Sequence, residues 1–137
     1  MLRDDYLMRL IQQLAQFLAR IAGFNRRREY QSALDEARRA WDELDIPHEL
    51  VDRLDGVALA DLLRDPAKMR AAAALLAEEA VALAATGDPL HATHRRKRAY
   101  QLYGEAHARD PQPEDDEAMR RIAVHLPAHE LTTIAGE

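Results

Sequence analysis

Apolar residues recur at alternating intervals of four and three positions in the first part of this chain. This spacing runs from Leu7 to Ile21 within about residues 3–22, and it returns over about residues 27–45. Because an α-helix turns once in about 3.6 residues, such spacing places one apolar stripe along a helix. The pattern therefore predicts two long amphipathic helices at the start of the chain.

Prolines, glycines and aspartates divide the remainder of the chain into further helical segments. Proline suits the first helical turn, where its missing N–H would have no partner, and aspartate suits the cap before it. The expected segments are two short helices, from Pro47 to Asp55-Gly56 and over 57–64, and three long helices over about 66–86, 89–109 and 114–125. No segment shows the sustained alternation of a strand, so we expect an all-α fold with about five long helices and two short ones.

The length of the chain suits a single domain. It has 137 residues and no cysteine, and this length is enough to bury a hydrophobic core without disulfides. We expect one helical domain over residues 1–126. Pro127 follows the last expected helix, and we expect the segment 127–137 to be a loosely ordered tail.

A phrase in the segment 89–109 has the spacing of a repeat helix. Ala99, Tyr103 and Ala106 match the Ala, aromatic and Ala positions in the second helix of a tetratricopeptide repeat (TPR). The preceding turn at Gly87-Asp88 lies seven residues too far upstream for a standard repeat, so this helix is expected to carry a basic extension before Ala99. The phrase predicts TPR-like helical hairpins, an architecture used mostly to hold other molecules.

The start of the chain carries a second recognisable phrase. The residues of this Asp-Tyr-x-x-Arg-x-Ile-x-x-Leu phrase are Asp5, Tyr6, Arg9, Ile11 and Leu14. It resembles the opening of an uncharacterised bacterial family of small TPR-like proteins of unknown function. The resemblance extends through Tyr30–Trp41, Leu59–Arg64 and the Gly87-Asp88 turn, and it covers most of the chain. It implies a TPR-like fold and brings no catalytic or ligand residues with it.

The composition argues against several functional classes. A net charge of −5 provides no basic field for nucleic acid, and the absence of cysteine excludes thiolate catalysis. The five glycines are scattered rather than gathered in a phosphate loop, and Ser32, the single serine, lacks a nucleophile motif. No stretch reaches the roughly 18 apolar residues of a membrane span. We therefore expect a cytoplasmic protein that is not an enzyme, needs no cofactor and binds neither nucleic acid nor a membrane.

Three residues near the start of the segment 89–109 form the best candidate metal site. His91 and His94 are three positions apart and share one helix face, and Asp88 lies one turn earlier. This spacing suits Zn²⁺ or Ni²⁺ if a further ligand comes from elsewhere in the fold. The alternative is that these histidines are ordinary surface residues.

The densest run of charge lies directly after this histidine pair. Arg95, Arg96 and Arg98, with Lys97 among them, occupy the first half of a helix, where cations oppose the helix dipole. Something other than helix stability must therefore favour them. We expect Arg95, Arg96 and Arg98 to bind a protein partner through its acidic groups, with Tyr100 as a hot spot beside them.

Other interpretations of this basic run remain open. It can be a solvated face with local ion pairs, each contributing little. It can also face acidic residues of the same chain, either Glu114–Glu117 or the pair Glu78 and Glu79. A phosphate-bearing ligand is a further alternative to an acidic protein.

The apolar face of the first helix is wider than one neighbouring helix would cover. Burying each large side chain contributes about 1.5–3 kcal/mol, so such a face is not left in water. Either the two short helices fold over it or a second subunit covers it. We expect a homodimer whose interface is formed by Leu7, Leu10, Leu14, Phe17 and Ile21.

Together these features predict a non-catalytic protein–protein interaction or scaffold protein. It would self-associate through the first helix and bind a partner with the basic face of the helix expected over residues 89–109. The alternative function is a metal- or small-ligand-binding protein centred on Asp88, His91 and His94.

Overall fold

Seven helices, a final helical turn over residues 128–131 and no strand are found in residues 2–131, the part of the chain that our computed structural model describes, with side chains from Asp4 onward. The helices are α1 (Leu2–Arg26), α2 (Tyr30–Glu43), α3 (His48–Arg53), α4 (Gly56–Leu63), α5 (Pro66–Ala85), α6 (Pro89–Arg109) and α7 (Pro113–Ala123). The predicted all-α class, with five longer helices and two short ones, is confirmed. The TPR-like arrangement stays a prediction.

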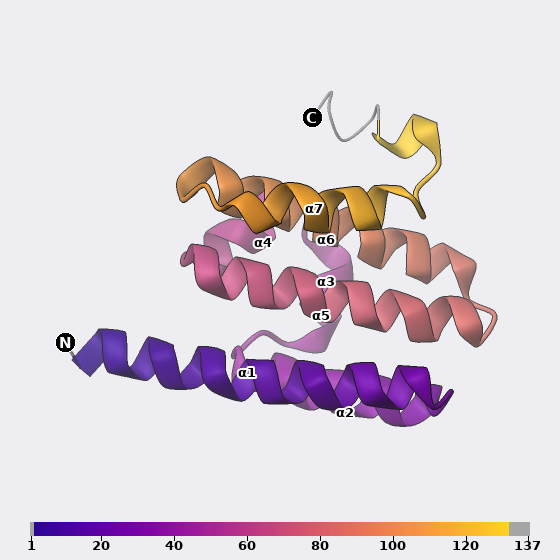
Figure 1. Cartoon of the computed structure of the whole chain (residues 1–137), viewed down its shortest axis with the longest axis horizontal. Helices are drawn as coiled ribbons and strands as arrows, with labels where there is room; N and C mark the ends of the chain where they lie inside the picture. The colour runs from indigo at the N-terminus through magenta and orange to yellow at the C-terminus, as the bar shows by residue number, and fades with distance from the viewer. Residues whose placement is uncertain (1, 132–137) are drawn as a thin grey trace.

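The helices form two layers, and α5 is the middle helix of the layer that faces the viewer in Figure 1. In Figure 1, α1, α5 and α7 follow one another from bottom to top, with α2 behind α1 and α6 behind α7. The most extensive packing joins α5 to α6, and α5 also packs on α1 and α2. On the other side, α7 packs mainly on α6. The side of α5 that faces the viewer in Figure 1 therefore lies between α1 and α7.

The core is filled by large apolar side chains from both layers and by alanines. Its fully buried members include Ile21, Trp41, Leu59, Leu76 and Leu102. Ala99 and Ala106 of the repeat phrase are fully buried, and their small side chains allow α6 to pack closely on its neighbours. In the described part of the chain, no helix is both long and apolar enough to cross a membrane.

Aspartate caps and prolines start the two central helices as the sequence predicts. Asp65 Oδ1 accepts the backbone N–H of Ala67 at 2.8 Å, and Asp88 accepts that of His91 at 3.3 Å. A proline follows each of these caps at the first helical position. Gly87 supplies the positive φ of 86° that turns the chain from α5 into α6.

The first helix is longer than expected. It continues through Gly23 and Asn25 to Arg26 instead of ending near residue 22, and the turn falls at Arg28 with a φ of 61°. Asn25 is buried, and its Nδ2 donates to Glu78 Oε2 on α5 at 2.7 Å. This contact between helices, which is not visible in the local sequence, keeps the last turn of α1 against α5.

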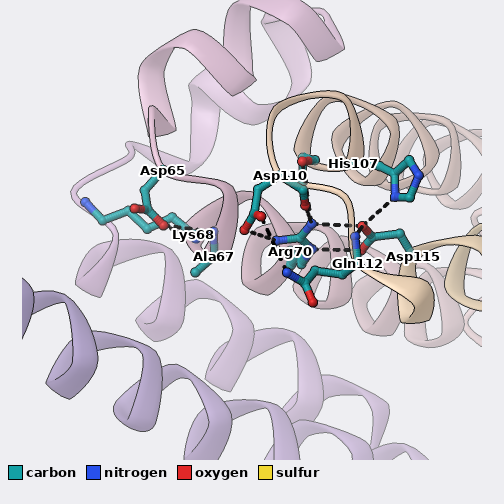
Figure 2. Close-up of polar contacts among 9 residues, drawn as sticks. Asp65, Ala67, Lys68, Arg70, His107, Asp110, Gln112 and Asp115 are labelled. Atoms are coloured by element: carbon teal, nitrogen blue, oxygen red, sulfur yellow. Dashed lines mark hydrogen bonds and ion pairs between the residues drawn. The ribbon is translucent and has the colours of Figure 1, made fainter.

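A cluster that we call the junction fastens α7 to α5 and α6. It consists of Arg70, His107, Asp110, Gln112 and Asp115. Figure 2 shows Arg70 pointing between the two aspartates, with His107 on the other side of Asp115. Arg70 Nε and Nη2 donate to the two oxygens of Asp115 at 2.7 and 2.8 Å, and Arg70 also donates to the carbonyl oxygen of Asp110.

Both carboxylate oxygens of Asp115 accept hydrogen bonds within the junction. His107 Nδ1 lies 2.9 Å from Asp115 Oδ2, and the backbone N–H of Gln112 donates to the same oxygen at 3.2 Å. The hydrogen bond from Arg70 is the largest influence on the carboxyl group and holds the pKa of Asp115 at about 2, below its ordinary value of 3.8. The junction therefore fixes the position of α7 through a buried carboxylate whose hydrogen bonds stabilise its charged form.

The expectation of a loose tail from residue 127 is wrong for its first part. Leu126 is buried, residues 128–131 form a helical turn, and Leu131 packs against the core. Lys97 Nζ on α6 pairs with Glu130 at 3.5 Å. Residues 132–137 lie outside the described part of the chain.

Candidate functional site

The basic run on α6 does not form one face. Successive residues of an α-helix point about 100° apart, so four consecutive side chains leave the helix in different directions. Arg95 points inward and is 4% exposed, which is a correction of its expected role as a partner-binding residue. Its Nη1 lies 3.5 Å from Glu79 Oε1 on α5, and its Nη2 lies 3.2 Å from Asp52.

Glu79 explains why an arginine is buried at this place. Its side chain is 2% exposed and also accepts a hydrogen bond from Trp41 Nε1 at 2.9 Å, while His48 Nε2 lies 3.2 Å from its second oxygen. The interpretation that the basic run meets acidic residues of the same chain is thus confirmed for Arg95 and Glu79. This network joins α2, α3, α5 and α6 and has a structural role.

Arg98 and Tyr100 also differ from the expected exposed contact residues. Arg98 Nε donates to the carbonyl oxygen of Leu54 at 2.7 Å, just beyond the end of α3. Its Nη1 donates to Gln101 Oε1 at 2.9 Å, and Tyr100 is half-buried against the core. Arg98 therefore satisfies a free carbonyl at the end of α3.

Unlike Arg95 and Arg98, Arg96 lines a surface hollow, which we call the groove. The groove has a volume of about 550 Å³ and is lined by α1, α5, α6 and α7. Its apolar lining includes Leu18, Ala22, Ala74, Ala77, Val81 and Ile122. Its polar lining consists of Glu78, Arg96, Tyr103, Arg121 and His125. A mostly apolar hollow of this size with a few polar groups has the usual character of a binding site.

The electrostatics of the groove are unbalanced. Burial lowers the pKa of Arg96, and among the described residues no carboxylate lies within ion-pair distance of Arg96 or Arg121. The one carboxylate in the lining, Glu78, accepts a hydrogen bond from Asn25. Burial also raises the pKa of Tyr103, so its hydroxyl stays protonated near neutral pH. The groove thus offers positive charge and a hydroxyl donor above an apolar floor.

The expected dimer interface on α1 is mostly covered within the chain. Leu10, Leu14 and Ile21 are buried, because α2 and α5 pack on α1 from two sides. This corrects their expected role as a face for a second subunit, and it also differs from the alternative in which the short helices cover α1. Leu7 and Phe17 remain partly exposed, and Phe17 packs against the core. The homodimer itself stays a prediction.

The candidate metal residues are brought together only in part. Asp88 and His91 are in contact, with His91 Nδ1 2.8 Å from Asp88 Oδ2, while Asp88 also caps α6. His94 is exposed, and in residues 2–131 no group of three histidine, cysteine or acidic side chains is placed to hold a metal ion. The pair at Asp88 is therefore a helix cap with a hydrogen-bonded histidine.

Most residues of the groove are not predicted as site residues from the sequence. Of the expected partner-binding residues, Arg96 alone lines it, and Arg121, His125 and Glu78 were not predicted to be site residues. No local signal separates Arg121 from its neighbour Arg120, since both are arginines in the last turn of the same helix. Tyr103, the aromatic of the repeat phrase, packs against the core and lies half-buried at the groove.

The groove also holds titratable groups. Glu78 is engaged by Asn25, whereas His125 is exposed. The positive charges of Arg96 and Arg121 are suited to recognition of an anionic partner. Comparison with protein-family models, with curated proteins and with solved structures found no match for this chain.

Proposed function

We propose that this protein is a non-catalytic interaction or scaffold protein that holds a protein partner in the groove. The observation that carries the proposal is the position of Arg96, a partly desolvated cation with no acidic partner among the described residues. Burying a charge without a counter-ion costs free energy, and a fold used only for structure has no reason to retain it. An acidic partner segment would supply the missing counter-charge.

The rest of the groove supports the same proposal. The α5 side of the lining exposes Val81 at 42%, beside alanines that would let another element approach closely. Exposed apolar surface rimmed by polar groups is typical of an interaction site. The basic extension expected on α6 contributes Arg96 to this site, whereas Arg95 and Arg98 support the fold.

A groove-filling substitution tests the proposal. Val81→Trp places a large side chain in the groove at a position that is already 42% exposed, so the fold is expected to tolerate it. Tagged wild-type and variant proteins would be used for affinity capture from the source organism, with quantitative mass spectrometry of what is retained. We expect specific partners of the wild type to be lost from Val81→Trp.

A matched substitution outside the groove provides the control. Val57 on α4 is 55% exposed and does not line the groove, so Val57→Trp makes the same chemical change elsewhere. It should retain the partners of the wild type. A folded Val81→Trp protein that captures the same partners as Val57→Trp would refute the groove as the binding site.

A further inference from the structure

We infer that the groove receives an acidic amphipathic α-helix of the partner protein, with its apolar side on the alanine floor and its carboxylates at Arg96 and Arg121. This inference rests on the proposed function and specifies the form and chemistry of the partner segment. Four properties of the groove lead to it: its supply of backbone partners, the small side chains of its floor, its charge and its length.

The groove favours a helix over an extended peptide. An extended segment brings unpaired backbone N–H and C=O groups, which are costly to bury unless the site supplies partners for them. Apart from its two arginines and His125, the groove offers only the Tyr103 hydroxyl and Glu78, which is already engaged by Asn25. A helix satisfies its own backbone and presents only side chains to such an apolar floor.

The floor is also shaped for a helix. Ala74 and Ala77 on α5 and Ala118 on α7 contribute only methyl groups, as does Ala22 on α1. The distance between packed helices depends on the side chains at their contact, and small ones let the axes approach closely. The guest helix can then insert larger apolar residues between α1 and α7.

The charges of the groove select an acidic guest. Arg96 and Arg121 have no carboxylate partner among the described residues, and both line the groove. Hydrogen bonds between arginine and carboxylate are strong and directional, especially in partly desolvated surroundings. The site is positive within a chain of net charge −5, so its sign is local and not a property of the whole surface.

The length of the groove sets the spacing of the guest residues. The lining runs from Ala74 to Val81 on α5, and from Ala118 on α7 to His125 just beyond the end of that helix, a separation of seven positions in each case. At about 1.5 Å per residue this corresponds to about two helical turns. The guest is therefore expected to use apolar residues at positions i, i+3 or i+4, and i+7, with acidic residues beside them.

Selection from a library of random 16-residue peptides displayed on their own mRNA tests this inference directly. Wild-type protein would be the target, and peptides retained equally by Val81→Trp would be discarded. We expect the enriched sequences to be acidic and to carry the helical apolar spacing. A proline placed in the middle of such a peptide should abolish binding, since proline breaks the helix.

The dependence on charge is measured on the strongest selected peptide by fluorescence polarisation. Arg121→Glu is expected to weaken binding at least about tenfold, because it places a like charge opposite the guest carboxylates. Arg120→Glu makes the same change at an exposed neighbour outside the groove and should change affinity less than about twofold. Arg96→Gln should weaken binding to a similar degree as Arg121→Glu.

Several outcomes would overturn the inference. Enrichment of basic or proline-rich extended peptides that still require an open groove would exclude the acidic helix while leaving the proposed function in place. Binding of decanoate to the wild-type protein but not to Val81→Trp, without any enriched peptide, would point to a small amphiphilic carboxylate instead. Absence of both, together with partners retained by Val81→Trp, would remove the proposed function as well.

Discussion

Two arginines that lie beside α7, Arg70 on α5 and Arg96 on α6, differ in whether a carboxylate pairs with them. Arg70 in the junction is bound to Asp115 by two hydrogen bonds of 2.7 and 2.8 Å, and this pairing raises its pKa. Arg96 in the groove has no carboxylate partner among the described residues, and burial lowers its pKa. Both lie beside the helix that completes the groove.

The difference separates structure from recognition in this molecule. A paired arginine has its charge compensated and holds elements together, so its loss should cost stability. An unpaired, partly desolvated arginine destabilises the folded protein, so its removal should raise the free energy of unfolding. We therefore expect substitutions at the two places to change stability with opposite sign.

The largest expected effect comes from breaking the junction. Asp115→Ala leaves Arg70 partly buried without its carboxylate and removes the acceptor for the Gln112 N–H, so the free energy of unfolding should fall by about 3 kcal/mol. Urea denaturation at neutral pH measures this loss. Asp116→Ala, an exposed neighbour in the same helical turn, should cost less than about 1 kcal/mol. Equal losses in the two variants would contradict a special role for the junction.

Acid should weaken the junction to a smaller extent. The pKa of Asp115 is about 2 in the folded protein and 3.8 in the unfolded chain, so its contribution is fully present above about pH 4 and is lost as pH falls toward 2. This difference corresponds to about 2 kcal/mol, of which about 1–2 kcal/mol should disappear between pH 5 and pH 2.5. Wild-type protein should lose this much more than Asp115→Ala over the same interval. Parallel pH profiles would show that Asp115 is not the responsible group.

The smallest expected effect has the opposite sign. Arg96→Met retains much of the aliphatic stem and removes the uncompensated charge, so the free energy of unfolding should rise by about 0.5–1 kcal/mol. Thermal unfolding in low salt measures the change, with the exposed Arg120→Met as a control that should be nearly neutral. A clear loss of stability in Arg96→Met would mean that Arg96 supports the fold as Arg70 does.

The fold could be predicted from the sequence where local signals decide it. The caps at Asp65 and Asp88 and the apolar spacing of α2 place these helices close to their observed positions. The end of α1 could not be predicted, because Asn25 is held by a residue 53 positions later. A helix stop is a local preference, and a tertiary hydrogen bond overrides it.

The candidate site was harder to predict for a geometric reason. A run of basic residues in sequence suggests one patch, whereas consecutive helical positions point in different directions. Arg95 therefore meets Glu79 in the interior and Arg98 meets the end of α3, which leaves Arg96 in the groove. Arg121 joins it from another helix, and only the packing of α7 on α6 shows that the two belong together.

The attachment of α7 has a kinetic consequence. This helix packs mainly on α6 and is otherwise held by the junction and by Ile122 in the core, so we expect it to open as a small cooperative unit before the helices around Trp41 unfold. For a guest bound in the groove as we infer, the opening rate of this unit would set how often a second route of release, besides direct dissociation, becomes available. Hydrogen exchange of the α7 amides would report that rate, separately from global unfolding.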